Sequence, residues 1–225
     1  MTFIMMDTEY EQSNRTGKRK EVFEVGWSVC HIDNATKSRI TNLTRNDFKI
    51  DQSINRRQIP HANLFQHWLP RLPRPDKVEC IRLANTGHVR PYYQRQDFKY
   101  GSIQTMNPRQ LDHHFADLVH EYLKKGPIFF VGHDVSNEHV AFEELGLERS
   151  AELLKELPCL DTQKLFSWAN HCTFNREKMG LDKLIAELYG VPVAKIPTFF
   201  TPHNAGNDSI MTGIALLFKL MMLYT

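Results

Sequence analysis

The sequence is poor in cysteine and has no long apolar run, and each absence argues against a class of protein. The four cysteines include no C-x-x-C pair, which argues against a zinc ribbon and a redox motif. We expect Cys30, Cys80, Cys159 and Cys172 to be small buried hydrophobic residues rather than a disulfide framework. No apolar run could span a bilayer, and residues 1–6 are too short for a signal peptide. We therefore expect an intracellular protein, cytoplasmic or nuclear, without a membrane partner.

The chain also lacks a strong net charge, at +2 over 225 residues, but its charge is unevenly distributed. Residues 51–100 hold nine Lys or Arg, four Asp or Glu and six aromatic residues. Cations interleaved with aromatic rings suit a single-stranded nucleic acid, and Arg90 and Arg95 are candidate phosphate contacts. The alternative is a solvated, loop-rich insertion whose aromatic residues pack on the main core, because most charge runs are solvated faces.

The order of the predicted elements indicates an α/β protein. Strand patterns occur at 3–7, 22–32, less clearly 39–50, and 127–133, where the run is apolar enough to be buried on both faces. Helical spacing predicts helices over 107–125, 136–145, 160–169, 181–190 and 209–222. Residues 51–106, rich in proline and without a clear period, are expected to be an insertion. Hairpin strands followed by strands alternating with helices predict a mixed sheet, first antiparallel and then parallel, flanked by helices.

Two acidic residues follow directly on the first apolar segment, FIMMDTEY at 3–10. Asp7 and Glu9 are two residues apart on a predicted strand, so both side chains point to one face. Two buried carboxylates on one face repel each other unless a cation lies between them. The alternative is a pair at a strand end that faces solvent, because D-x-E often occurs by chance.

A second acidic segment follows the buried strand, in GHDVSNE at 132–138. Asp134 and Glu138 lie just beyond the end of that strand. Asp134 is also suited to cap the next helix. Glu138 would lie on the first turn of that helix, where the helix dipole favours an anion. Either carboxylate could reach a cation held by Asp7 and Glu9.

A third segment, HNAGND at 203–208, opens the last amphipathic helix. Its pattern H-x-A-x-x-D is far more specific than D-x-E. His203 and Asp208 flank a turn that contains glycine. Taken alone, His203 is better explained as a loop histidine with ordinary hydrogen bonds than as a catalytic residue.

In this order along the chain, the three segments resemble the DEDDh 3′–5′ exonucleases, the DnaQ-like branch of the ribonuclease H-like fold. EVFEVGWSVCHID at 21–33 is similar to the second strand of that family, and CLDTQKLF at 159–166 to the segment after its second motif. HNAGND resembles in particular fungal members, including the exonuclease that partners Argonaute in RNA silencing. The resemblance covers nearly all of residues 1–225 except 51–106, and it implies a single exonuclease-like domain.

The resemblance implies a site with two divalent cations, Mg²⁺ or Mn²⁺. Asp7, Glu9, Glu138 and Asp208 match the metal-binding acids, and His203 matches the general base. The family has Asp where this chain has Glu138, so the carboxylate is one methylene farther from the backbone. Two bound metal ions lie only about 3.5–4 Å apart. Moving the carboxylate by one methylene therefore matters for how it binds them. Asp134 is the alternative ligand in this region.

The resemblance also implies the activity, which is removal of nucleotides from the 3′ end of a single-stranded nucleic acid, with RNA slightly favoured over DNA. An Argonaute-type silencing protein is then the expected partner. The alternative is a degenerate exonuclease domain that binds RNA or a protein without cleaving. The expected substrate-binding residues are Thr8, His133, Asn204, Arg90 and Arg95.

Overall fold

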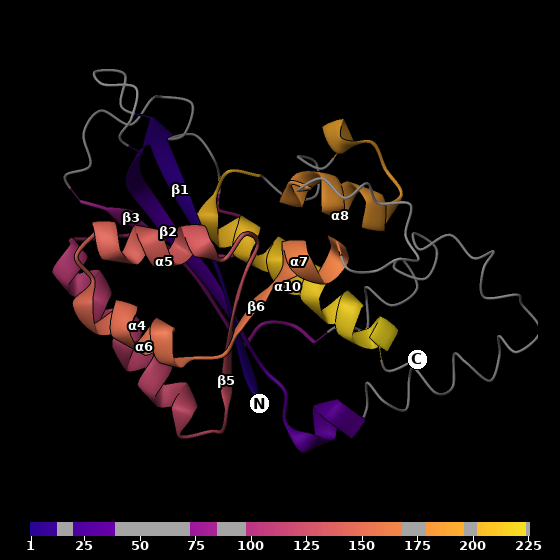
Figure 1. Cartoon of the computed structure of the whole chain (residues 1–225), viewed down its shortest axis with the longest axis horizontal. Coiled ribbons are helices and arrows are strands. Elements are labelled where there is room, and N and C mark those ends of the chain that lie inside the picture. The colour runs from indigo at the N-terminus through magenta and orange to yellow at the C-terminus, as the bar shows by residue number, and fades with distance from the viewer. Residues whose placement is uncertain (13–19, 39–72, 85–97, 168–178, 196–201, 224–225) are drawn as a thin grey trace, which may run out of the picture.

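The computed structural model describes residues 1–12, 20–38, 73–84, 98–167, 179–195 and 202–223, which are built around a central sheet (Figure 1). Six strands pair in the order β4-β3-β2-β1-β5-β6. They are β1 (Thr2–Gln12), β2 (Lys20–His31), β3 (Lys77–Leu83), β4 (Ile103–Met106), β5 (Ile128–Gly132) and β6 (Cys159–Asp161). β1, β2 and β3 are antiparallel, and the outer strands pair in parallel with their neighbours. The predicted ribonuclease H-like mixed sheet is confirmed.

Helices cover both faces of this sheet. One layer contains α4 (Pro108–Leu123), α5 (Ser136–Glu144) and α6 (Glu148–Glu156). The other layer contains α7 (Thr162–Ser167), α8 (Leu181–Tyr189) and α10 (Ala205–Leu223), with the short 3-10 helix η2 (Val193–Lys195) after α8. Within the described ranges, no helix combines the length and the apolar character that crossing a membrane requires.

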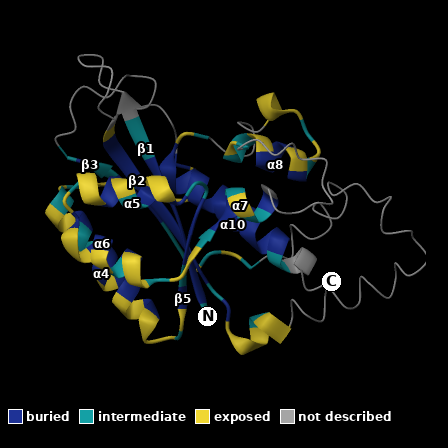
Figure 2. Ribbon diagram, in the orientation of Figure 1, coloured by how far each residue is buried: buried dark blue, intermediate teal, exposed yellow. Residues whose placement is uncertain are grey.

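The alternation of side chains along β1 decides which layer its acidic residues face. Ile4 and Met6 pack into the cluster formed with α4, α5 and α6. Phe3 and Met5 point the other way and pack with residues of α10. The helices turn their buried side toward the sheet (Figure 2). Because successive side chains alternate, Asp7 and Glu9 continue the row of Phe3 and Met5 on the α10 face.

The structure corrects several predicted boundaries. β1 does not end at the acidic pair but runs on to Gln12. β3 and β4 lie inside residues 51–106 and belong to the central sheet, so that segment is not an insertion throughout. The strand predicted at 39–50 lies outside the described residues. α6 and β6 were not predicted from the sequence.

The cysteines agree with the sequence prediction in part. Cys30 and Cys80 are free and buried, as expected, whereas Cys159 is free and exposed. Cys172 lies outside the described residues.

Candidate active site

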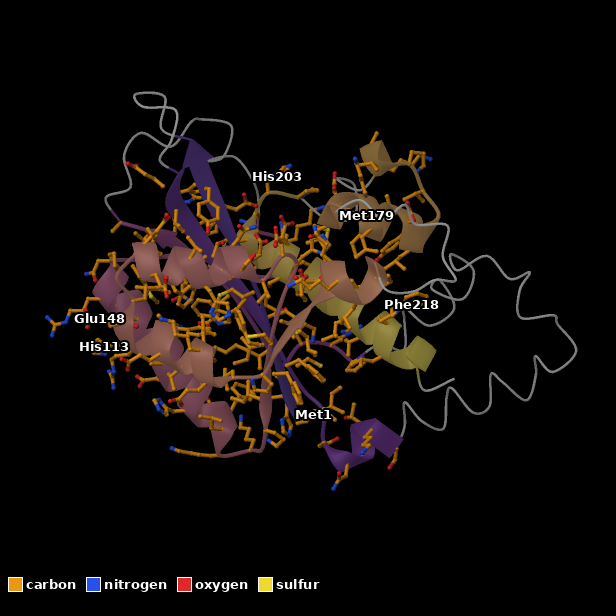
Figure 3. The ribbon with its side chains drawn as sticks, viewed as in Figure 1. Met1, His113, Glu148, Met179, His203 and Phe218 are labelled. Atoms are coloured by element: carbon orange, nitrogen blue, oxygen red, sulfur yellow. The ribbon has the colours of Figure 1, made fainter. Side chains whose placement is uncertain are left out.

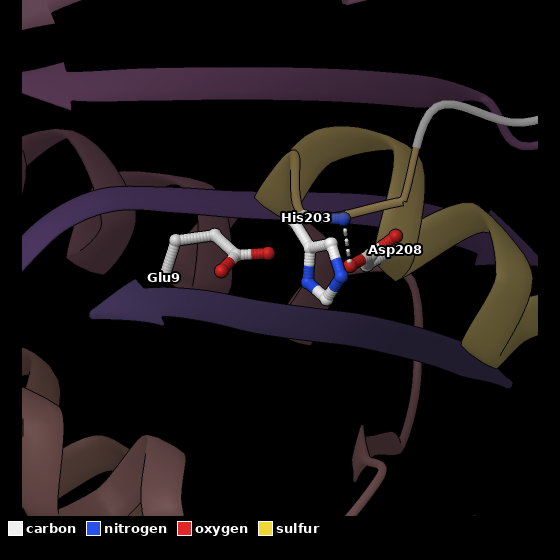
Figure 4. Close-up of side chains that lie close together, drawn as sticks. All are labelled: Glu9, His203 and Asp208. Carbon is white, nitrogen blue, oxygen red and sulfur yellow. Dashed lines mark hydrogen bonds between the residues drawn. The ribbon is translucent and has the colours of Figure 1, made fainter. Parts of the chain in front are cut away.

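Three side chains from the two ends of the chain meet on the α10 face (Figures 3 and 4). Glu9 comes from β1, His203 from the loop before α10, and Asp208 from the first turn of that helix. Each offers one potential ligand atom, and these atoms all lie within 4.8 Å of one another. The backbone N–H of His203 donates to Asp208 Oδ2 at 3.0 Å, as the dashed line in Figure 4 marks. The loop and the helix therefore hold an imidazole beside two carboxylates.

Asp7 and Glu138 complete the acidic group at the end of β5. The parallel pairing of β1 with β5 ends at Met5 and Val131, so β1 carries Asp7 beyond the end of β5. The chain then turns into α5, which places Glu138 on its first turn. Burial raises the pKa of Asp7 well above its usual value, and repulsion from Glu9 and then Glu138 raises it further. The fold thus brings the four acids named from the sequence into one electrostatic group.

The remaining pKa shifts point in the same direction. Burial, followed by repulsion from Asp208, raises the pKa of Glu9 from 4.5 to about 9. Burial is also the main reason why the pKa of Glu138 rises from 4.5 to about 8. The pKa of Asp208 is raised well above its usual value by burial and then by Asp7. A shared upward shift of this kind indicates carboxylates that lack a neutralising cation.

These residues fit divalent cations. Among the described residues, Glu138 Oε2 and Asp208 Oδ1 are buried without a hydrogen-bond partner. In the same part of the chain, neither Lys nor Arg forms an ion pair with any of the four acids. Leaving such oxygens unsatisfied is costly, and Mg²⁺ and Mn²⁺ prefer carboxylate oxygens as ligands. The four acids therefore provide carboxylate oxygens, which a metal ion prefers, and they have no ion pair in the described residues to balance their negative charge.

Asp134 lies beside this group, but its carboxylate is engaged at the entry to α5. Its Oδ1 accepts from Ser136 Oγ at 3.0 Å, and its Oδ2 accepts from Asn137 Nδ2 at 3.2 Å. Its backbone has φ 71°, a left-handed conformation, and its N–H donates to Asp161 Oδ1 at 3.1 Å. These contacts fix the turn that delivers Glu138, so Glu138 is the better placed of the two acids to serve as a metal ligand.

Two of the residues expected to bind substrate form hydrogen bonds within the protein. Both ring nitrogens of His133 are engaged, Nε2 with the Met179 carbonyl oxygen at 2.7 Å and Nδ1 with Thr162 Oγ1 at 2.9 Å. Asn204 is fully buried, and its Oδ1 accepts from the Asn207 N–H at 3.0 Å, which caps α10. Their polar atoms thus bind protein in this structure, and contact of His133 and Asn204 with substrate stays a prediction.

The other residues expected to bind substrate are not placed against a ligand. Thr8 is buried between Asp7 and Glu9, and its contact with substrate remains a prediction. Arg90 and Arg95 lie outside the described residues.

One acid that was not predicted from the sequence lies at the centre of this region. Glu24, on β2, is 1% exposed. Its Oε1 accepts from Asn204 Nδ2 at 2.8 Å and from the Ala205 N–H at 3.0 Å. Its Oε2 accepts from Arg82 Nη2 at 3.0 Å. The available signal was a lone glutamate among apolar residues of a predicted strand, where an acid is buried only if it is paired.

A glycine beside Glu24 allows α10 to approach the sheet closely. A Cβ atom added to Gly26 would lie 2.1 Å from the Gly206 nitrogen and 2.2 Å from the Ala205 carbonyl carbon. Any larger residue at this position would therefore push the first turn of α10 away from β2. Since that turn carries Asp208 and follows His203, Gly26 helps to set the dimensions of the site.

Comparison with known proteins agrees with this arrangement. The model of a family described as DNA polymerase III subunit epsilon-like, C-terminal domain, with the short name DEDDh_C, matches residues 78–218. The match covers more than half of the chain and includes Glu138, His203 and Asp208, whereas Asp7 and Glu9 precede it. No curated protein matches the chain.

Proposed function

Since the chain belongs to the DnaQ-like DEDDh exonuclease family, we propose that it is a metal-dependent 3′–5′ exonuclease acting on single-stranded nucleic acid. The observation that carries this proposal is the meeting of Glu9, His203 and Asp208, whose potential ligand atoms lie within 4.8 Å of one another. Carboxylates and an imidazole at this separation are the groups that metal-assisted hydrolysis of a phosphodiester requires.

The four acids would hold two divalent cations, Mg²⁺ or Mn²⁺. When bound, such ions stabilise the charge on the phosphate and make a water molecule more acidic. Glu138 and Asp208 each have a buried oxygen without a partner in the described residues, which supports this role. Asp7 and Glu9 approach from β1, on the same face of the sheet.

His203 would act as the general base. It is exposed to solvent, whereas Glu9 is half-buried and Asp208 is buried, so the imidazole is the most accessible of the three to water. An imidazole nitrogen takes a proton from the attacking water while the water oxygen bonds to phosphorus. The bond from phosphorus to the 3′ oxygen of the preceding nucleotide then breaks, and a nucleoside 5′-monophosphate leaves. The hydrogen bond from the His203 N–H to Asp208 ties the position of the base to that of an acid.

For the substrate we propose RNA ahead of DNA, because HNAGND resembles exonucleases of RNA silencing. The family match does not extend to that subgroup. An Argonaute-type partner and a cytoplasmic or nuclear location accordingly remain predictions from the sequence.

A linear and a circular substrate of the same sequence test the direction of cleavage. The purified protein with Mn²⁺ is expected to shorten a 5′-labelled linear strand stepwise, to leave a circular strand intact and to release mononucleotides. A strand with a non-hydrolysable 3′-terminal linkage should resist. Cleavage of the circle would assign an endonuclease instead. Binding of both substrates without cleavage would indicate the degenerate binding module.

A further inference from the structure

We propose that Glu24, clamped by Arg82, is a positioning residue that holds the segment carrying the general base in its working geometry. The effect of Glu24 on catalysis rests on the proposed function. Its role in holding the segment rests only on contacts within the protein. Glu24 does not belong to the metal-binding acids, because its contacts differ in kind from theirs.

The oxygens of Glu24 are satisfied by three donors from two parts of the fold. Oε1 accepts from the Asn204 side chain at 2.8 Å and the Ala205 N–H at 3.0 Å, both at the start of α10. Oε2 accepts from Arg82 Nη2 on β3 at 3.0 Å. By contrast, Glu138 and Asp208 each keep a buried oxygen without a partner in the described residues. Glu24 therefore has no oxygen left over for a metal, and it links the sheet to the helix.

The segment held by Glu24 is the one that fixes the base. His203 has φ 63°, a left-handed conformation that a residue with a side chain adopts at a cost. Such a conformation persists only where the surroundings impose it. The next residue, Asn204, is bound to Glu24, and the N–H of His203 is bound to Asp208. Contacts on both sides thus confine His203.

The register of the sheet explains why this role falls to Glu24. Glu9 pairs with Glu24 across β1 and β2, and Glu24 pairs with Arg82 across β2 and β3. Residues directly opposite each other share a face, so the three form one row beneath the start of α10. The row runs from a candidate metal ligand, through the positioning acid, to its counter-charge. Arg82 is partly exposed, whereas Glu24 is buried, so the ion pair lies at the solvent-facing edge of the site.

Substituting Glu24 with Gln tests this role, because Gln cannot accept from both groups of donors at once. One end of its amide would face donors with its own NH₂ group. A matched control exists on the opposite face of the sheet. There the buried Glu79 accepts from Trp27 Nε1 at 3.0 Å and lies 3.0 Å from His114 Nε2 on α4. Glu79→Gln removes an equivalent buried charge without touching residues 203–208.

Amide hydrogen exchange gives a readout that does not depend on activity. In Glu24→Gln, the amides of residues 203–208 are expected to exchange faster than in the wild type, and those of β1 and β5 to stay protected. Glu79→Gln should leave residues 203–208 unchanged. If Glu24→Gln does not fold, Arg82→Gln is the second variant, because it removes the clamp from a partly exposed position. Unchanged exchange of residues 203–208 in the folded variant, with Arg82→Gln also unchanged, would overturn the proposal.

Kinetics then test whether Glu24 acts through His203. Displacing a catalytic group by about 1 Å costs on the order of 10²-fold in rate, so Glu24→Gln should lower kcat by about that factor with KM retained. In a His203→Ala background the same substitution should cost little more, because the group it positions is absent. Full additivity of the two losses would overturn the proposal. If the wild type cleaves nothing, the proposed function fails, while the exchange measurement still decides the role of Glu24 in holding the segment.

Discussion

His203 and Asp208 illustrate at the residue scale how one short segment supplies two different functional groups. His203 is exposed and can meet water, whereas Asp208, five residues later, is 7% exposed. The hydrogen bond from the His203 N–H to Asp208 joins them across the turn. The spacing H-x-A-x-x-D is thus the number of residues that one tight turn and the first helical turn need to bring an imidazole beside a carboxylate.

Removing the imidazole should slow the reaction without weakening substrate binding. His203→Ala is expected to lower kcat by about 10²–10⁴-fold, as for loss of a general base. Its affinity for single-stranded nucleic acid should remain within a factor of about two, because His203 is proposed to accept a proton and not to bind a phosphate. Single-turnover kinetics and a filter-binding titration measure the two effects. His120→Ala, an exposed histidine on α4, is the control, and equal rates for both variants would exclude His203 as the base.

Gly26 offers a test of the close approach between β2 and α10. Gly26→Ala would place a Cβ 2.1 Å from the Gly206 nitrogen, which forces the helix to move. We expect a loss of about 1–3 kcal/mol in the free energy of unfolding, the usual range for overpacking, together with loss of nuclease activity. Chemical denaturation and a cleavage assay are the measurements.

Gly213→Ala is the matched control for this substitution. The three atoms nearest to its added Cβ belong to the Met5 side chain, and the terminal methyl of Met5 is the nearest, at 3.0 Å. We expect this variant to stay close to wild type in stability and activity, since alanine also favours the helix. If the two variants behaved alike, the close approach at Gly26 would not matter for the site.

The residues of the site differed in how well the sequence could identify them. Asp7, Glu9, His203 and Asp208 were recognisable because short spacings on a strand and at a helix start place side chains on one face. Glu24 was not, because its partners Asn204 and Arg82 lie 180 and 58 positions away along the chain. The same distance explains why the sequence alone could not show that the Asn204 amide is bound to Glu24.

At the scale of elements, the entry to α5 is built to deliver one carboxylate. A Cβ added to Gly132 would lie 3.1 Å from Glu138 Oε2, so the glycine leaves space for the side chain. Asp161 holds the turn by accepting from the Asp134 N–H at 3.1 Å and the Gln163 N–H at 3.0 Å. The end of β5, the start of α5 and the end of β6 thus together fix the position of the Glu138 side chain.

Glu138→Gln should weaken metal binding in a manner that depends on pH. The pKa of Glu138 is about 8, so at pH 7 the metal-free side chain is mostly protonated and a metal must displace the proton. Wild-type affinity for Mn²⁺ is expected to rise between pH 6.5 and pH 8.5, and calorimetry should detect proton release. Glu138→Gln should bind more weakly and show a flatter pH dependence.

Glu144→Gln, an exposed position at the end of the same helix, is the control for that measurement. It should retain the affinity and the pH dependence of the wild type. An unchanged affinity for Mn²⁺ in Glu138→Gln would exclude Glu138 as a metal ligand and favour Asp134 as the alternative.

The elements differed in predictability for reasons of length and context. The buried strand β5 and the long helices α4 and α10 follow from apolar runs and helical spacing. β6 is three residues long and too short to show any period. β3 and β4 lie within a proline-rich, basic region, so the surrounding composition concealed that they pair with the central sheet.

At the scale of the whole molecule, the acidic group makes stability depend on pH and metal. The pKa values of Glu9 and Glu138 are about 9 and about 8 in the folded protein, against an ordinary value of 4.5. Between pH 4.5 and about pH 9, these two side chains bind more protons in the folded state than in the unfolded state. The free energy of unfolding of the metal-free protein therefore falls as pH rises from about 4.5 to about 9.

Thermal unfolding at a series of pH values tests this linkage. In EDTA, Tm is expected to decrease from pH 5 to pH 9, with a smaller slope in Glu138→Gln. Mn²⁺ should raise Tm strongly at pH 8 and weakly at pH 5, because the ion replaces protons only where the acids can ionise. A Tm that is insensitive to both pH and metal over this range would contradict the presence of a buried acidic metal centre.

The most direct test of the proposed exonuclease is the degradation of a 5′-labelled single-stranded RNA and a DNA of the same sequence. Each is incubated with the wild-type protein and with Asp7→Ala, first with Mg²⁺ and then with Mn²⁺. We predict a ladder that shortens from the 3′ end, that is faster on RNA and absent in EDTA, and that is lost in Asp7→Ala. Binding without a ladder in either metal, or an identical ladder from Asp7→Ala, would contradict catalysis at this site.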